Sequence, residues 1–211
     1  MTLLKAKVKD AAIGVAVADD PASLSAFLQP GCDAAIWRRQ TPPITQSWLD
    51  SLDPERLPRG RVVLPSVAVA DTVAHLFDDA GVPEGADRDW LQSDIVSLAA
   101  LFTQLFDAKF LRLRLEAVTT NACRRFHIDA ITARLVCTYR GTGTQYGIST
   151  DGNAPKRVFT VQTGAPILLR GTLWPAEPKS GLLHRSPPIE GTGETRLVLL
   201  LDPIFDPDDS E

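Results

Sequence analysis

The feature that most constrains the fold is a change of hydrophobic period near Lys109. Upstream of this residue, apolar side chains recur at the spacing of a helix. Downstream of it, Leu111, Leu113 and Leu115 alternate with charged residues, a pattern typical of a strand with one buried face. A chain that changes period in this way is expected to form helices first and a β-rich core second.

The clearest predicted helix covers residues 90–107. Asp89 is its expected N-cap, and Gln92 stands where the partner residue of a capping box belongs. An apolar stripe along this helix predicts that it packs against a sheet, and its members are Leu91, Ile95, Leu98, Phe102, Leu105 and Phe106.

The rest of the first half is expected to be helices and loops. Proline and small polar residues begin a short predicted helix over 21–29, and 34–37 is a short apolar run expected to be a strand. Prolines and a glycine indicate a loop over 54–60, and helical spacing returns over 67–80. Residues 1–108 are therefore predicted to be a mainly helical part that packs on the core.

The second half contains further short segments with strand character, separated by glycine-rich turn clusters: 123–128, 133–139, 157–162, 166–170, 181–186 and 195–202. Strands at this spacing favour an antiparallel barrel or sandwich. The predicted fold class is α+β, with a double-stranded β-helix core (jelly-roll, cupin-like) over 109–202 preceded by N-terminal helices. Residues 203–211 are expected to be an acidic, solvated tail, and the whole chain to be one compact domain.

Composition excludes several classes of function. The 211 residues carry a net charge of -4, with an isoelectric point near 5.4, so no nucleic-acid partner is expected. No apolar stretch approaches the roughly 18 residues that a membrane span needs. The three cysteines include no C-x-x-C pair, which favours reduced thiols in the cytoplasm. Residues 5–18 resemble a signal peptide only weakly, and the oligomeric state stays open.

Two histidines and one aspartate form the most informative constellation. In the segment His127-Ile128-Asp129, alternation along a strand would point the first and last side chains to the same face. His184 lies on a later predicted strand that a jelly roll can bring alongside. Two imidazoles and one carboxylate can hold a metal such as non-haem Fe(II) and leave positions open on it. The alternative is a chance spacing, or a histidine and an aspartate that form an ordinary hydrogen bond.

Arg196 opens the last predicted strand and shares a face with Val198 and Leu200. A cation at the inner end of an apolar strand needs a partner, because an unpaired buried charge is costly. A bound carboxylate is one such partner, since the planar guanidinium can hold it with two hydrogen bonds. The third histidine of the chain, His75, is expected in the helical first half as a helix-surface or packing residue.

Three long segments resemble a known family: CRRFHID at 123–129, RLVCTYRGTGT at 134–144 and LHRSPP at 183–188. They look like a bacterial family catalogued as domain of unknown function 1826, to which no activity is assigned, and the resemblance runs from about Ile36 onward. More remotely, the order of strands, H-x-D, His and Arg is similar to the Fe(II)/2-oxoglutarate-dependent oxygenase superfamily.

The superfamily resemblance implies roles for particular residues. His127, Asp129 and His184 would be Fe(II) ligands, Arg196 would bind the distal carboxylate of 2-oxoglutarate, and Tyr139 would add a hydroxyl. The chain departs from the common form in having Val where a Ser usually follows that arginine by two places.

The implied activity is hydroxylation of an unidentified small molecule or peptide, with residues 141–154 as a candidate lid. Two alternatives stay open. The same ligands could hold Zn(II), Ni(II) or another divalent metal in a binding or metal-homeostasis protein without turnover. The resemblance supports zinc, because that family is often found among zinc-responsive genes. The barrel could also be an interaction domain that binds no metal.

Overall fold

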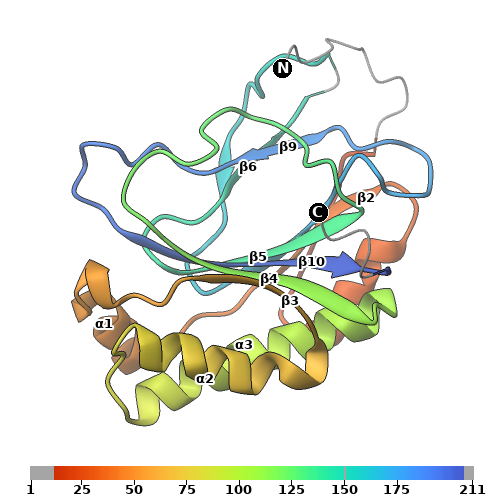
Figure 1. The fold of residues 1–211 in the computed structure, drawn as a ribbon. Helices are drawn as coiled ribbons and strands as arrows, with labels where there is room; N and C mark the ends of the chain where they lie inside the picture. The colour runs from red at the N-terminus through yellow and green to blue at the C-terminus, as the bar shows by residue number, and fades with distance from the viewer. Residues whose placement is uncertain (1–11, 150, 207–211) are drawn as a thin grey trace.

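The computed structural model describes residues 12–149 and 151–206. Two β-sheets face each other, and helices cover the outer side of the larger sheet (Figure 1). This arrangement is an α+β fold with a double-stranded β-helix core, as the sequence predicts. Among the described residues, no helix is both long enough and apolar enough to cross a membrane.

The larger sheet is antiparallel except for the pairing of its first two strands. Its strand order is β1 (Gly14–Ala18), β2 (Cys32–Trp37), β8 (Pro166–Arg170), β5 (Ala133–Arg140), β10 (Arg196–Ile204), β4 (Phe110–Val118) and β3 (Gly60–Pro65). The smaller sheet has the order β7 (Phe159–Thr160), β6 (Gln145–Ile148) and β9 (Leu182–Arg185).

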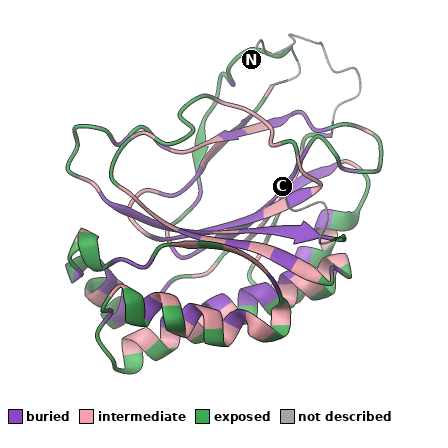
Figure 2. Cartoon of the chain, viewed as in Figure 1, coloured by how far each residue is buried: buried purple, intermediate pink, exposed green. Residues whose placement is uncertain are grey.

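Helix α3 (Ala86–Phe106) packs on the larger sheet through the apolar stripe that the sequence predicts, and it is one of six helices in the described residues. The six helices are η1 (Pro21–Leu28), α1 (Pro43–Ser51), η2 (Pro54–Arg56), η3 (Ser66–Ala68), α2 (Val69–Asp79) and α3. Buried residues of α3 and the outward leucines of β4 and β10 form the main hydrophobic core. Figure 2 shows this burial on the sheet side of the helices.

Strand alternation divides the central strands between two faces. On β10, Leu197, Leu199 and Leu201 join the core beneath the helices, whereas Val198 belongs to a second apolar cluster between the two sheets. The same holds on β5, where Val136 faces the smaller sheet. Residues on this inner face are therefore the ones that can line a site inside the jelly roll.

The N-terminal part contains more β-structure than predicted. Its strands β1, β2 and β3 join the larger sheet. The predicted strand 34–37 lies within β2, whereas β3 begins at Gly60, the last residue of the predicted loop. Helix α3 begins at Ala86 after Gly85, so the predicted N-cap at Asp89 is wrong. The predicted division of the chain at residue 108 does not follow the sheets, because the larger sheet draws strands from both sides of it.

Three predictions in the second half also need correction. Segment 123–128 is not a regular strand, since His127 alone forms a β-bridge there. The candidate lid at 141–154 contains strand β6. The predicted acidic tail overlaps the end of β10 and otherwise reaches 207–211, outside the described residues. The segment 5–18, which resembles a signal peptide only weakly, lies outside the described residues up to residue 11 and forms β1 at its end.

Candidate metal centre

A single antiparallel bridge brings the two predicted histidine ligands together. The backbone N–H of His127 donates to the carbonyl of His184 at 3.0 Å, and the reverse hydrogen bond is also 3.0 Å long. Residues paired in this way point their side chains to the same face of the sheet. The two imidazole centroids lie 4.6 Å apart as a result.

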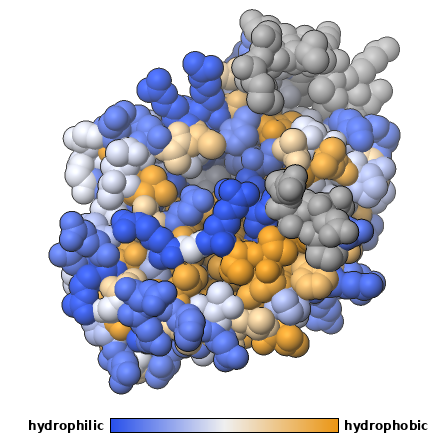
Figure 3. Space-filling model, viewed as in Figure 1, coloured by the Kyte–Doolittle hydropathy of each residue, from blue (hydrophilic) through white to orange (hydrophobic). Residues whose placement is uncertain are grey.

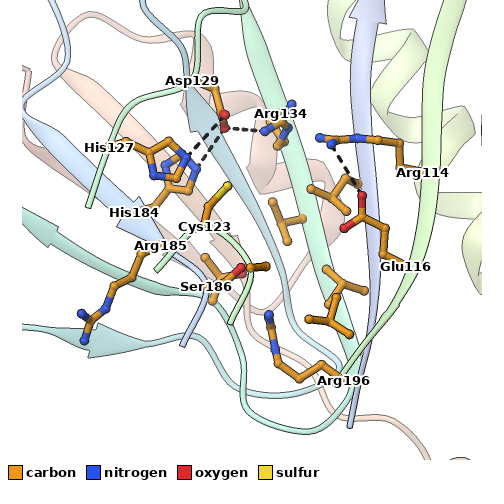
Figure 4. Close-up of a pocket in the computed structure, with 16 residues that line it drawn as sticks. Arg114, Glu116, Cys123, His127, Asp129, Arg134, His184, Arg185, Ser186 and Arg196 are labelled. Carbon is orange, nitrogen blue, oxygen red and sulfur yellow. Dashed lines mark hydrogen bonds and ion pairs between the residues drawn. The ribbon is translucent and has the colours of Figure 1, made fainter. Parts of the chain in front are cut away.

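Asp129 completes a three-residue cluster at the inner end of this bridge. Its carboxylate oxygens lie 3.5 Å from Nε2 of His127 and 3.0 Å from Nε2 of His184. One donor atom from each of the three residues lies within 4.8 Å of the others. Figure 4 shows both rings directed at the carboxylate. The arrangement brings the three predicted metal ligands to one point.

Neighbouring groups hold two of these ligands in the orientation that a metal needs. Nδ1 of His127 lies 2.8 Å from the carbonyl oxygen of Arg125, which can only accept, so Nδ1 carries a proton and Nε2 is the atom that faces Asp129 and could bind a metal. Arg134 donates to Oδ2 of Asp129 at 2.5 Å and holds Asp202 through two further hydrogen bonds. Outer groups of this kind fix the geometry of metal ligands.

The protonation states of Asp129 and His184 suit metal binding, whereas the raised pKa of His127 opposes it. Burial opposes ionisation of Asp129, but hydrogen bonds from the two histidines and the charge of Arg134 outweigh it, so the pKa of Asp129 lies far below its ordinary value. Burial lowers the pKa of His184, which favours the neutral imidazole. The hydrogen bond to Asp129 raises the pKa of His127. Divalent transition metals accept a carboxylate with neutral imidazoles, so a metal would have to displace the proton that Asp129 favours on His127.

Arg196 lies at the start of β10 and points into the same pocket (Figure 4). Its side chain is buried, with Nε donating to the carbonyl of Thr142 at 2.6 Å and Nη2 to the hydroxyl of Thr138 at 3.2 Å. Burial lowers the pKa of Arg196 to about 10. Arg196 remains a cation at neutral pH, and its Nη1 is not used by either of these hydrogen bonds.

The pocket between the sheets has a volume of about 190 Å³. The metal-ligand cluster lies on one side and Arg196 on another, while the apolar side chains of Val136, Val198 and Leu200 form the floor. In the same view as Figure 1, Figure 3 shows hydrophilic side chains gathered around a recess in this face.

The structure does not bring Tyr139 to this pocket. Its side chain is fully buried on the opposite face of β5, where the hydroxyl donates to Asp94 of α3 at 2.7 Å. A role for Tyr139 in co-substrate binding does not fit this geometry, and the expectation is corrected accordingly. His75 is exposed on α2, the surface position that was one of the two expected for it.

Arg134 is the site residue that sequence reasoning missed. The sequence did contain an indication of this role. Arg134 is two residues from Val136 and shares the inner face of β5 with it, and a charge that points inward requires a partner. The same reasoning singled out Arg196. The two carboxylates that bind Arg134 are distant in sequence, so their identity could not be read from the local pattern.

The fold and the centre together place this chain in the class of double-stranded β-helix proteins, whose solved members include dioxygenases. One similar structure is dioxygenase for auxin oxidation 1 from Arabidopsis thaliana in a binary complex with 2-oxoglutarate. It is 11% identical, has a TM-score of 0.53, and the match covers 93% of this chain and 94% of that one. The rice dioxygenase for auxin oxidation is 12% identical with a TM-score of 0.53, and the match covers 93% and 84% of the two chains. Identities this low establish the shared fold alone.

The particular family follows from the sequence itself. The family model described as Protein of unknown function (DUF1826) matches residues 18–202, and the chain belongs to this family. No curated protein matches the chain.

Proposed function

We propose that the protein is a non-haem Fe(II)- and 2-oxoglutarate-dependent oxygenase. The observation that carries the proposal is the convergence of His127, Asp129 and His184 in a pocket that also contains Arg196. The 2-oxoglutarate complex of the structurally similar plant dioxygenase gives the proposal further support. Fe(II) at this centre, with 2-oxoglutarate and O2, would supply the oxidising power for hydroxylating a C–H bond.

The residues of the chain would provide binding and orientation. His127, Asp129 and His184 would occupy three positions around the metal and leave the others open. Arg134 would keep Asp129 ionised and in place through its hydrogen bond to Oδ2. Because Arg134 is itself held by Asp202, the carboxylate is anchored to the larger sheet rather than to a loop.

Arg196 would bind the distal carboxylate of 2-oxoglutarate. Its contacts with Thr142 and Thr138 fix the guanidinium before a ligand arrives, so less conformational entropy is lost on binding. The apolar floor formed by Val198 and its neighbours would limit the access of water to the reacting atoms.

The test is succinate formation from 2-oxoglutarate by the purified protein with Fe(II) under O2, together with metal binding measured by calorimetry. We expect His127→Ala to lose tight Fe(II) binding and 2-oxoglutarate-dependent succinate formation. His75→Ala is the matched control, because it removes an exposed histidine on α2 and should leave both measurements unchanged.

Two outcomes would contradict the proposal. If the protein binds no Fe(II) and His127→Ala leaves its metal content unchanged, the cluster is not a metal site. If the protein binds stoichiometric Zn(II) tightly and forms no succinate with Fe(II), the alternative of a zinc-binding protein without turnover is favoured.

A further inference from the structure

The pocket is rich in arginine although the chain as a whole is acidic. Arg114, Arg134, Arg185 and Arg196 line it, while the net charge of the protein is -4. Burying several cations together is unfavourable unless anions balance them. The partner of each arginine therefore indicates what the pocket is built to bind.

Three of these arginines are already engaged. Arg134 pairs with two carboxylates, as described above. Arg185 donates to Gln145 at 2.8 Å, and its guanidinium lies 4.4 Å from the centre of the Phe126 ring. Arg196 is held by its two threonine contacts and has its proposed role toward the co-substrate.

Arg114 differs, because it forms ion pairs with Glu116 and Asp202 but two of its nitrogens form no hydrogen bond within the described residues. Within the described part of the chain, its Nε and Nη2 are buried and have no hydrogen-bond partner. The neighbouring carboxylate oxygens are 3.6 Å away in Glu116 and 3.9 Å away in Asp202, beyond ordinary hydrogen-bond length. Burial, together with the positive charge of Arg134, lowers the pKa of Arg114. A partly buried guanidinium with unused donors is costly, and an anion would relieve that cost.

The position of Arg114 suits contact with a substrate. It projects from β4 beside Arg134, on the other side of the pocket from the histidine pair (Figure 4). Its neighbour on β10 is Leu200, which belongs to the apolar floor. A ligand with an apolar body could lie on this floor with its charged end at Arg114.

Arg114 presents a guanidinium with unused donors to the part of the pocket away from the histidine pair (Figure 4). Arg185 adds no second cation there, because its guanidinium turns away from the pocket toward Gln145 and Phe126. One unsatisfied guanidinium matches a ligand with one carboxylate.

We infer that the substrate is a small monocarboxylate with an apolar body, and that Arg114 is the specificity residue that binds its carboxylate. The inference rests on the proposed function, since it treats the remaining space of the pocket as the substrate site. The planar guanidinium can hold a carboxylate with two parallel hydrogen bonds, and an amide of the same shape cannot form that charge-assisted pair.

The test compares matched carboxylates and primary amides, beginning with phenylacetate against phenylacetamide and hexanoate against hexanamide. Their binding is measured by calorimetry to protein loaded with Zn(II), which prevents turnover, at saturating 2-oxoglutarate. We expect the carboxylate to bind about tenfold or more tightly than its amide. In Arg114→Gln this ratio should fall to about one, and Arg114→Lys should restore part of it, because the charge returns without the planar fork.

Arg61→Gln is the matched control. Arg61 is exposed on β3 directly opposite Arg114, and it does not line the pocket, so the same loss of charge there should keep the carboxylate preference. Zinc affinity and circular dichroism check that each variant is folded. Equal or undetectable binding of both members across the panel, or an unchanged preference in Arg114→Gln, would overturn the inference.

Failure of this inference can be told apart from failure of the proposed function. Binding of 2-oxoglutarate alone to the metal-loaded protein is measured first. If it is absent, the proposed function fails, and the probes are then compared without co-substrate. The difference between the wild-type protein and Arg114→Gln still reports the role of Arg114, because both proteins retain Arg196.

Discussion

At the scale of single residues, Arg134 connects the metal-ligand carboxylate to the sheet. It donates to Asp129 at 2.5 Å and holds Asp202 with hydrogen bonds of 2.6 Å and 2.8 Å. Asp202 is fully buried, so the arginine neutralises one carboxylate while it orients the other. Its removal should therefore affect both metal affinity and folding stability.

Arg134→Gln is expected to weaken Zn(II) or Fe(II) binding by about 10- to 100-fold, the usual effect of losing a group that orients a metal ligand. It should also lower the free energy of unfolding by about 3 kcal/mol, because Asp202 is left buried without its partner. Calorimetry and urea denaturation measure the two effects. Arg88→Gln is the control, since it breaks an arginine–aspartate pair with Asp78 outside the pocket. Metal affinity within about twofold of wild type would contradict the orienting role.

Tyr139 lies on the face of β5 that meets the helices, opposite the face that lines the pocket. Its hydroxyl donates to Asp94, which also forms an ion pair with Arg39, so Tyr139 belongs to a polar network beneath α3. Tyr139→Phe should lower the free energy of unfolding by about 1–2 kcal/mol through loss of this hydrogen bond. Binding of 2-oxoglutarate to the metal-loaded variant should stay within about twofold of wild type, because the hydroxyl lies outside the pocket. A large loss of 2-oxoglutarate affinity with unchanged stability would instead return Tyr139 to the co-substrate site.

At the scale of elements, strong and regular patterns were predictable from the sequence and weak ones were not. The alternation in β4 and the apolar stripe of α3 both appear in the structure, because each reflects one buried face of a long element. Strand β3 was missed, since prolines near it resemble a loop although an edge strand tolerates them. Strand β6 was missed because it is short and contains Gly147, where a Cβ would lie 2.4 Å from the carbonyl oxygen of Arg157.

Some residues of the candidate site were likewise predictable from the sequence and others were not. Arg196 was accessible to sequence reasoning because alternation along β10 states which side chains share a face. His127 and Asp129 were found from their residue types and close spacing, although they do not lie on a regular strand. The position of Tyr139 was not predictable, because β5 is buried on both sides and its sequence does not distinguish the inner face from the outer one. Which face meets the helices is decided by tertiary packing.

The loop that carries Asp129 is held in place by backbone hydrogen bonds from the segment that follows β8. Segment 171–173, after β8, donates backbone hydrogen bonds to the carbonyls of Thr132, Asp129 and Ile131. Gly171 permits this close approach, since a Cβ there would lie 1.8 Å from the carbonyl oxygen of Ile131. The metal centre therefore depends on a contact between two loops.

Gly171→Ala is expected to push the Asp129 loop away and lower metal affinity by at least about tenfold. It should also lower the free energy of unfolding by about 2–4 kcal/mol, because backbone atoms must move to admit the methyl group. Gly193→Ala is the control: it imposes alanine at a positive φ with open space around it and should cost about 1 kcal/mol without changing metal affinity. Equal effects of the two variants on metal binding would argue against the loop contact.

At the scale of the whole molecule, a buried carboxyl couples stability to pH. Asp33 on β2 is fully buried, and its Oδ2 accepts the backbone N–H of Gly181 at 3.0 Å. Its Oδ1 has no hydrogen-bond partner within the residues that the structure describes. Burial raises the pKa of Asp33 to about 7, although the hydrogen bond from Gly181 and the charge of Arg170 partly oppose this. The contact joins an N-terminal strand to the chain just before β9, so its protonation affects the folded state as a whole.

The sign of the effect follows from the direction of this shift. The folded protein keeps the proton of Asp33 up to about pH 7, whereas the unfolded chain releases it near the ordinary pKa of 3.8. Folding stability therefore falls as the pH rises from about 4 to about 7. Above about pH 7 both states are ionised, and this contribution no longer changes with pH. The loss should amount to about 2–4 kcal/mol. Asp33→Asn removes this titration and can keep the bond from Gly181. The difference in free energy of unfolding between this variant and wild type should therefore shift in favour of the variant from about pH 5 to pH 7 and stay constant to about pH 8. Any change in stability that the amide causes independently of pH leaves this trend unaffected. Urea denaturation at each pH measures this, with Asp50→Asn as an exposed control for the change in net charge. A stability difference that does not vary with pH would show that Asp33 is already ionised in the folded protein.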